Sequence, residues 1–398
     1  MKLSKKEYLL LVASAIFACA ITIANVFSNV YLFSYCNSLQ IMALYSACKC
    51  LFMFFAFFLF SKIRFNALRS MKVGLCFLIV TFCIILLLHD TFVHIAMLYL
   101  VGCLWGFGEG GFYLSMNTMN QLVTKKETRM KYVGFNGAIN AFVAVLSPLL
   151  ASLCVIVMKD DLKGYLLSFQ FVVVLFLLLL YVLRYLNIED LNPEKQSYLK
   201  IYRESKKETS WRFISMINFL QGFRESLSLC VTGLLVFQMM SDHSTWYALV
   251  LAGFSVVAIL SNMVLSKWMN TEKRRKLFFI GNLGMLFSGM ILVLSSSFEN
   301  AILHGITHNL FVPFVSMPIM FDTMNVLQDS IAKHQFEVRM VLREFYLEAG
   351  RILGLIVYAT CNLFGKQDDL LSFMIIYGSS IVLLWYVKHK QGIMNQYQ

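Results

Sequence analysis

Twelve long apolar stretches, separated by loops that are alternately rich and poor in positive charge, constrain the fold of this 398-residue chain most. A bilayer core about 30 Å thick needs roughly 20 apolar residues per spanning helix. A spanning helix satisfies its own backbone hydrogen bonds, which lipid cannot do. With 59% hydrophobic and 14% charged residues, the chain has more apolar surface than a soluble domain of this length can hide. The sequence therefore predicts an all-helical membrane protein.

The expected spans, whose boundaries carry an error of a few residues, are 8–33, 39–60, 72–88, 94–118, 132–157, 165–185, 212–238, 245–265, 277–297, 300–322, 342–364 and 370–387. Lys and Arg gather at both termini and in the loops after the even-numbered spans, whereas the other loops hold only Lys159, Lys163 and Lys366. By the positive-inside rule, both termini are cytoplasmic. We expect a multi-pass protein of the plasma membrane. Its net charge of +12 reflects this topology and does not indicate nucleic-acid binding.

The longest polar interval between spans divides the chain into two sets of six. Short motifs recur at matching places in the two sets: Ser61-Lys62 and Ser266-Lys267, and Thr118-Met119-Asn120 and Thr323-Met324-Asn325. Such internal similarity indicates a duplication. We therefore expect an N-terminal six-helix bundle (1–185), a cytoplasmic linker (186–209) and a C-terminal six-helix bundle (210–398).

In its twelve spans, cytoplasmic termini, central linker and related halves, the chain resembles the major facilitator superfamily. The resemblance implies two pseudo-symmetric bundles that rock around a central site, as in secondary transporters. It also implies a cytoplasmic gate in the loops after spans two and eight. The basic part of that family signature is present as Arg69, Lys72, Arg274, Arg275 and Lys276. The acidic part is missing, and Ser61 and Ser266 stand about where it would be.

Four charged residues fall near the middle of predicted spans: Lys49, Glu109, Arg224 and Glu225. A charge at the bilayer centre costs about 2.5–3.5 kcal/mol on insertion scales. One interpretation is static pairing that locks helices together. The other is a hydrated pocket shared by both bundles, in which a carboxylate exchanges a proton. Glu109 is the first candidate, because glycines surround it, and Arg224 could anchor an anionic group.

The start of the eleventh span carries further charges. Glu344, Glu348 and Arg351 share one helix face at i, i+4 and i+7, and Arg343 and Asp322 lie nearby. The pattern favours an inner gate that holds the bundles together, with a proton path as the alternative.

Polar side chains in other spans complete the candidate substrate and proton site. His304 and His308 are one turn apart, Asn25 and Asn29 form a similar pair, and Trp105 lies mid-span. Neutral imidazole can bind metal or relay protons. Because no third ligand is visible, we expect hydrogen bonding in a cavity and no metal.

The leading hypothesis is a proton-coupled secondary transporter of a small organic solute, because carboxylates are available and no G-x-x-x-x-G-K-[ST] loop is present. The 36 Phe and 22 Met favour export slightly, and proton-coupled uptake of a polar or anionic nutrient is the alternative. A non-transporting sensor or assembly partner is a further possibility. An enzyme is disfavoured, because His304 and His308 have no nearby acid in sequence. We expect a monomer without cofactors, whose partners are its solute, protons and the lipid bilayer.

Overall fold

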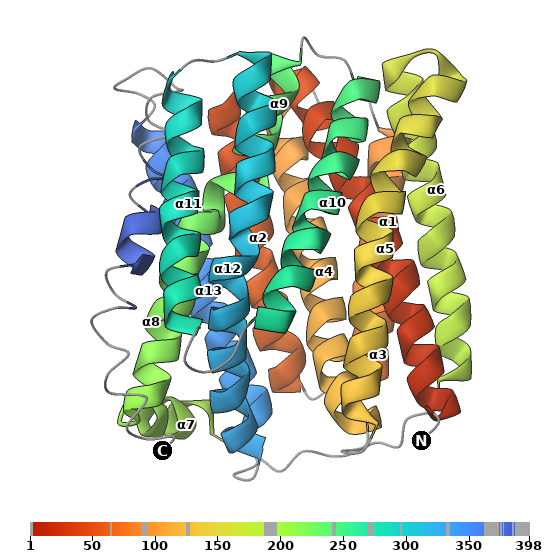
Figure 1. The fold of residues 1–398 in the computed structure, drawn as a ribbon. Helices are drawn as coiled ribbons and strands as arrows, with labels where there is room; N and C mark the ends of the chain where they lie inside the picture. Colours follow the sequence, from red (N-terminus) through yellow and green to blue (C-terminus); the bar gives the residue numbers. More distant parts are fainter. Residues whose placement is uncertain are drawn as a thin grey trace. The chain divides into compact units, whose positions relative to one another are not determined.

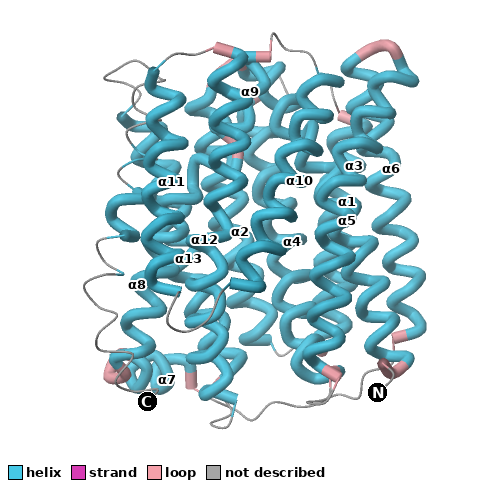
Figure 2. The backbone as a smooth tube through the Cα atoms, viewed as in Figure 1, coloured by secondary structure: helices cyan, strands magenta, loops and turns pink. Residues whose placement is uncertain are grey.

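The computed structural model describes residues 3–63, 66–88, 94–124, 128–186, 197–240, 244–268, 274–294, 297–331 and 335–361, together with residues 374, 376, 378–383 and 386. Within these ranges, all regular secondary structure is helical (Figure 1, Figure 2).

The first half of the chain forms α1 (Lys5–Cys36), α2 (Leu39–Ile63), α3 (Ala67–Leu87), α4 (Ile95–Val123), α5 (Arg129–Met158), α6 (Asp161–Val182) and the short 3₁₀ helix η2 (Leu183–Tyr185). The second half forms α7 (Tyr198–Ser205), α8 (Thr209–Glu225), the 3₁₀ helix η3 (Ser226–Leu229), α9 (Val231–Met239), α10 (Ser244–Trp268), α11 (Arg274–Leu294), α12 (Phe298–Ile331) and α13 (Phe336–Cys361).

Eight helices of the described part are long and apolar enough to cross a membrane: α1 to α6, α10 and α12. A shorter apolar helical stretch, Lys276–Ile291, lies in α11. The prediction of an all-helical membrane protein is therefore confirmed. Most of the last predicted span, 370–387, lies outside the described residues.

The chain forms two compact units. The first unit contains Met1–Pro193 and Met240–Ser255, and the second contains Glu194–Met239 and Val256–Gln398. The boundary at Ser255 falls inside α10, so the two parts of that helix belong to different units.

In the first unit, α1 packs against α5 and α6, and α4 packs against both α2 and α3. Aromatic side chains pack between the helices of this unit. The rings of Phe17 and Phe112 stack with centroids 3.4 Å apart, and Phe82 meets Trp105 edge to face at 4.9 Å. Polar contacts join the start of α10 to the same unit, since the Ser244 hydroxyl donates to Asp161 at 2.7 Å and also contacts the Tyr165 hydroxyl.

In the second unit, α8 packs against α13, and α11 packs against α12. Its apolar core includes Trp211 and Ile214 of α8 and Phe278 of α11, and the Phe278 ring stacks on Tyr386 at 3.9 Å. The first unit pairs its first span with its fifth and its third with its fourth. Two of these pairings recur in the second unit, where α8 of the seventh span packs against α13 of the eleventh, and α11 of the ninth span packs against α12 of the tenth.

The prediction of one continuous helix for the seventh span, 212–238, is wrong. The structure breaks it into α8, η3 and α9. Side chains cap backbone carbonyls at the break: the Ser226 hydroxyl donates to Phe223 O at 2.7 Å, and Thr232 donates to Leu227 O at 3.3 Å. The Phe223 carbonyl also accepts from the Ser226 backbone N–H, so a 3₁₀-type bond and a side-chain bond together close the last turn of α8. The break begins directly after Arg224 and Glu225, so it lies at the predicted mid-membrane charges.

Candidate functional site

A glycine-lined crossing of α4 and α2 positions the first charged cluster. A Cβ at Gly106 would overlap the Lys49 carbonyl oxygen, and one at Gly110 would overlap the Met53 carbonyl. Only a residue without a side chain permits this backbone approach, as at helix crossings in membranes generally. These two glycines therefore serve helix packing. They also hold Lys49 of α2 beside Glu109 of α4.

Glu109 is the centre of this first cluster. Its Oε1 accepts from Lys49 Nζ at 3.1 Å and from Trp105 Nε1 at 2.8 Å. Lys49 Nζ also lies 4.2 Å from the centre of the Trp105 ring. The Glu109 side chain is 7% exposed and that of Lys49 is 21% exposed. The carboxylate is thus buried with one cation and one neutral donor, while the ammonium keeps some access to solvent.

A second close crossing, of α8 with α13, positions the other cluster. A Cβ at Gly222 would overlap the Leu347 carbonyl, and one at Gly350 would overlap the Phe219 carbonyl. Each glycine faces a backbone carbonyl of the other helix, so no side chain separates the two backbones. The side chains next to these glycines can therefore contact one another directly.

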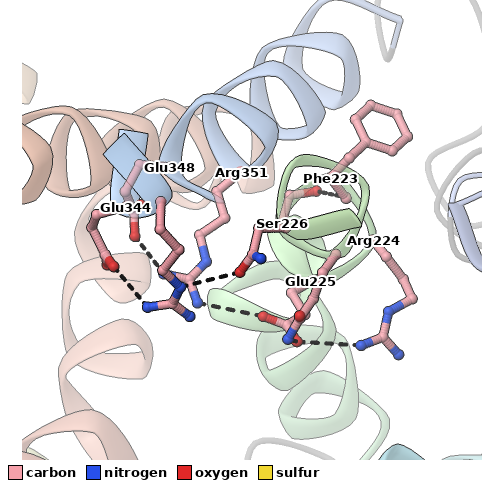
Figure 3. A network of polar contacts seen from close by, with 10 residues as sticks. Phe223, Arg224, Glu225, Ser226, Glu344, Glu348 and Arg351 are labelled. Carbon is pink, nitrogen blue, oxygen red and sulfur yellow. Dashed lines mark hydrogen bonds and ion pairs between the residues drawn. The ribbon is translucent and has the colours of Figure 1, made fainter. Parts of the chain in front are cut away.

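Glu225, at the last turn of α8, collects three donors. Its Oε1 accepts from Gln221 at 2.8 Å and from Arg224 Nη2 at 3.2 Å, and its Oε2 accepts from Arg351 Nη2 at 3.4 Å. Arg351 also donates to Glu348 at 2.5 Å. Figure 3 shows Arg224 and Arg351 on opposite sides of Glu225. The formal charges of the two arginines and the two glutamates cancel.

Arg224 is more deeply buried than its partner. Its side chain is 3% exposed, against 25% for Glu225. Among the described residues, its Nε has no hydrogen-bond partner. Buried polar atoms are normally paired, so an unpaired one needs an explanation.

Four of the residues predicted to form a gate make two ion pairs within the second unit. Arg343 contacts Glu344 at 2.9 Å and Asn218 of α8 at 3.1 Å. Asp322, at the predicted cytoplasmic end of span ten, pairs with Arg274 of α11 at 2.9 Å. These contacts tie α13 to α8 and α12 to α11.

Arg69 and Lys72 lie in the first turns of α3, where Arg69 is exposed and Lys72 is partly buried. Arg275 lies in the first turn of α11, and its side chain is outside the described part.

The two histidines lie in α12. His304 is buried, and its Nδ1 is 2.9 Å from the Ser288 hydroxyl of α11. The His308 ring is 5.4 Å from the His304 ring, and within the described ranges its Nδ1 is buried without a partner. His308 lies close enough to Arg224 to be affected by its positive charge. The described residues include no group of three potential metal ligands.

Asn25 is exposed and Asn29 is partly buried, one turn apart in α1. Trp105, the remaining candidate, belongs to the Glu109 cluster described above.

Three contacts were not anticipated from the sequence. Gln221 supports Glu225 from one turn upstream, a spacing that could have indicated the contact. Buried Arg339 binds Glu208 through two bonds of 2.7 Å, although its position suggested an ordinary loop cation. Buried Glu7 caps α1 together with Ser4 and accepts a bond from Thr128.

The four mid-span charges thus pair as Lys49 with Glu109 and Arg224 with Glu225. The first pair belongs to one unit and the second pair to the other. Their convergence on a shared pocket stays a prediction.

The comparisons with known proteins agree with this architecture. The family model for the Major Facilitator Superfamily matches residues 5–355, and the chain belongs to this superfamily. It is therefore a multi-pass membrane transporter of a class that binds small-molecule solutes, and not an enzyme.

Among curated proteins, the chain is similar to the uncharacterized protein YqgE of Bacillus subtilis (strain 168). The two are 24% identical over 367 residues, which is 90% of this chain and 83% of that protein. Among solved structures it is similar to a mutant form of the nucleoside transporter NupG (TM-score 0.72, 11% identity, 97% of this chain and 100% of the other). It is also similar to a variant of the E. coli fucose:proton symporter FucP (TM-score 0.64, 12% identity, 96% and 98%). At such identities the structures support the fold alone.

Proposed function

We propose that the protein is a proton-coupled secondary transporter of a small organic solute that works by alternating access. Two bundles, 1–185 and 210–398, joined by the linker 186–209, would rock about a central site. The distribution of Lys and Arg supports a plasma-membrane protein with both termini in the cytoplasm.

The observation that supports proton coupling is the similar environment of Glu109 and Glu225. Each carboxylate is held by a neutral donor, Trp105 or Gln221, and by at least one cation, which is Lys49 for Glu109 and the two arginines for Glu225. Burial favours the neutral carboxylic acid, and the cation favours the carboxylate. A movement that changes the distance to the cation would therefore bind or release a proton.

Two features, the amino-acid composition and a buried arginine, favour opposite directions of transport. The abundance of Phe and Met favours export, but many of these side chains have packing roles. Phe17 and Phe112 stack within the first unit, and Met285 lies in the core of the second. Phe142 and Met320 are exposed on helices that can face lipid. Buried Arg224 favours the alternative, uptake of a polar or anionic nutrient together with protons.

Solute-driven pH changes in proteoliposomes test this proposal. The purified protein is reconstituted with a pH-sensitive dye inside the vesicles, and nucleosides, sugars, organic anions and amphiphilic cations are added in turn. We expect at least one class to move protons, and we expect Glu109→Gln or Glu225→Gln to abolish the movement while solute exchange continues. Glu299→Gln is the matched control, because Glu299 is exposed at the start of α12. If both site variants keep coupled transport, the proton assignment is wrong. If no solute in the panel moves and none raises the thermal stability of the protein, the proposed class of small organic solute is wrong.

A further inference from the structure

We infer that the Nε–Nη2 edge of Arg224 binds a singly charged oxyanion of the transported solute, and that this anion and the Glu225 carboxylate compete for the same guanidinium. The inference rests on the proposed function and specifies its substrate class.

The geometry of Arg224 is the first argument. A guanidinium is planar and binds an oxyanion through two parallel N–H donors on one edge. In Arg224 one donor of such an edge, Nη2, contacts Glu225 at 3.2 Å, and the other, Nε, is buried without a partner in the described structure. Glu225 therefore satisfies half of a two-donor edge. A carboxylate or phosphate oxygen pair would satisfy both donors.

The division of charge is the second argument. Glu225 is also bound by Arg351 and Gln221, so it keeps hydrogen-bond partners when Arg224 changes its own. The guanidinium of Arg224, in contrast, has Glu225 as its only ion-pair partner in the described part of the chain. Such a buried cation is costly to leave without an anion. Arg224 is thus the member of the cluster that is best placed to change partners.

The surroundings of Arg224 are the third argument. The helix interruption begins two residues later, at Ser226, and near a helix interruption backbone and side chains can approach a ligand. His308 of α12 lies within electrostatic range and has a buried Nδ1 without a partner among the described residues. Gly378 packs against Arg224, since a Cβ added to Gly378 would lie 3.2 Å from the Cα of Arg224. Both nitrogens, Arg224 Nε and His308 Nδ1, are therefore available to a polar ligand.

The exchange is balanced in charge. Before binding, Arg224 is positive and Glu225 is negative. Glu225 then takes one proton from solvent, and the solute anion takes its place on Nη2 and fills Nε. The net charge of the cluster does not change, so a proton and an anion bind together without an uncompensated buried charge. The other described charged or titratable groups that face this pair are Arg351 and Glu348 of α13 and His308 of α12.

Ligand-induced thermal stabilisation of the purified full-length protein tests this inference without any transport. The probes share one ring: benzoate and benzenesulfonate are anions with one charge at both pH values used, benzamide is neutral and benzylamine is a cation. We expect the anions alone to raise the Tm, with a larger rise at about pH 6 than at about pH 8. Arg224→Gln should abolish the rise, and Arg224→Lys should keep a weaker one because the charge remains without the two-donor edge. Arg212→Gln, an exposed arginine on the same helix, is the matched control.

Two more variants identify the competing group. In Glu225→Gln the competing carboxylate is absent, so the anions should bind about tenfold more tightly at pH 8, and the pH dependence should vanish. In His308→Gln the pH dependence should remain. The double variant Arg224→Gln/Glu225→Gln removes the pair together, so it should fold and bind no anion even if Arg224→Gln is unstable.

Anion stabilisation that survives in both Arg224→Gln and the double variant would overturn the inference. So would a panel in which only benzamide or benzylamine stabilises the protein, or in which no probe does. These outcomes are separate from the proton test, because Glu225→Gln should lose proton coupling while it gains anion affinity.

Discussion

Replacing the two partners of the Lys49–Glu109 pair one at a time should destabilise the protein to different degrees. Lys49→Met leaves a carboxylate that is 7% exposed, supported by its bond from Trp105. Breaking a buried pair costs about 3–5 kcal/mol, and the remaining bond puts the expectation near 3 kcal/mol.

Glu109→Gln is milder, because the amide oxygen can still accept from Trp105. Lys49 is 21% exposed and lies 4.2 Å from the centre of the Trp105 ring, a contact worth about 0.5–2 kcal/mol. We expect a loss of about 1 kcal/mol. The double variant removes both charges and should also cost about 1 kcal/mol, because a buried pair replaced by neutral side chains is often close to neutral. The interaction energy of the cycle is then about 3 kcal/mol.

Thermal unfolding of the purified protein, followed by tryptophan fluorescence, measures all four proteins. For a unit of this size, about 1 kcal/mol corresponds to roughly 2–4 °C. Lys49→Met should therefore melt roughly 6–12 °C below the parent protein, and the double variant should recover most of that loss. If Lys49→Met is no worse than Glu109→Gln, or if the two losses simply add, the buried pair does not stabilise the α2–α4 contact.

Two further predictions concern helix packing and an ion pair of the second unit. Gly350→Leu places a side chain against the Phe219 carbonyl and should lower the Tm strongly, since overpacking costs about 1–3 kcal/mol or more. Gly253→Leu is the control, because Gly253 has open space around it. Equal losses of Tm in the two variants would contradict the close crossing of α8 and α13. Arg339→Lys loses the two-donor bond to Glu208 and should cost about 2 kcal/mol, so an unchanged unfolding midpoint in urea or by heating would mean that this pair is dispensable.

The membrane architecture was largely predictable from the sequence, because a helix that crosses lipid needs a long uninterrupted apolar run. The eleventh span was expected at 342–364 and the helix covers Phe336–Cys361. The interruption of the seventh span was missed, because residues 212–238 are apolar enough to continue and hydropathy does not report backbone geometry. The only local signals were the adjacent charges of Arg224 and Glu225 and the two serines that follow them.

The pairing of charges was predictable only in outline. Residue counting placed Lys49 and Glu109 at similar depth, but the Gly106 contact that brings their helices together is a three-dimensional feature. Arg351 was assigned to a gate with Glu348, yet it also binds Glu225. Counting along one helix finds neighbours such as Glu348. It does not find a partner on another helix, which depends on how the two helices cross.

The backbone contact between α8 and α13 has a mechanical consequence. A helix pair separated by side chains can slide, because rotamers change to absorb the shift. At Gly222 and Gly350 no side chain lies between the two backbones, so we expect α8 and α13 to move together as one rigid body. Any rearrangement of the second unit should then preserve the Arg351–Glu225 contact and concentrate its bending beyond Glu225, in the 3₁₀ segment that leads to α9.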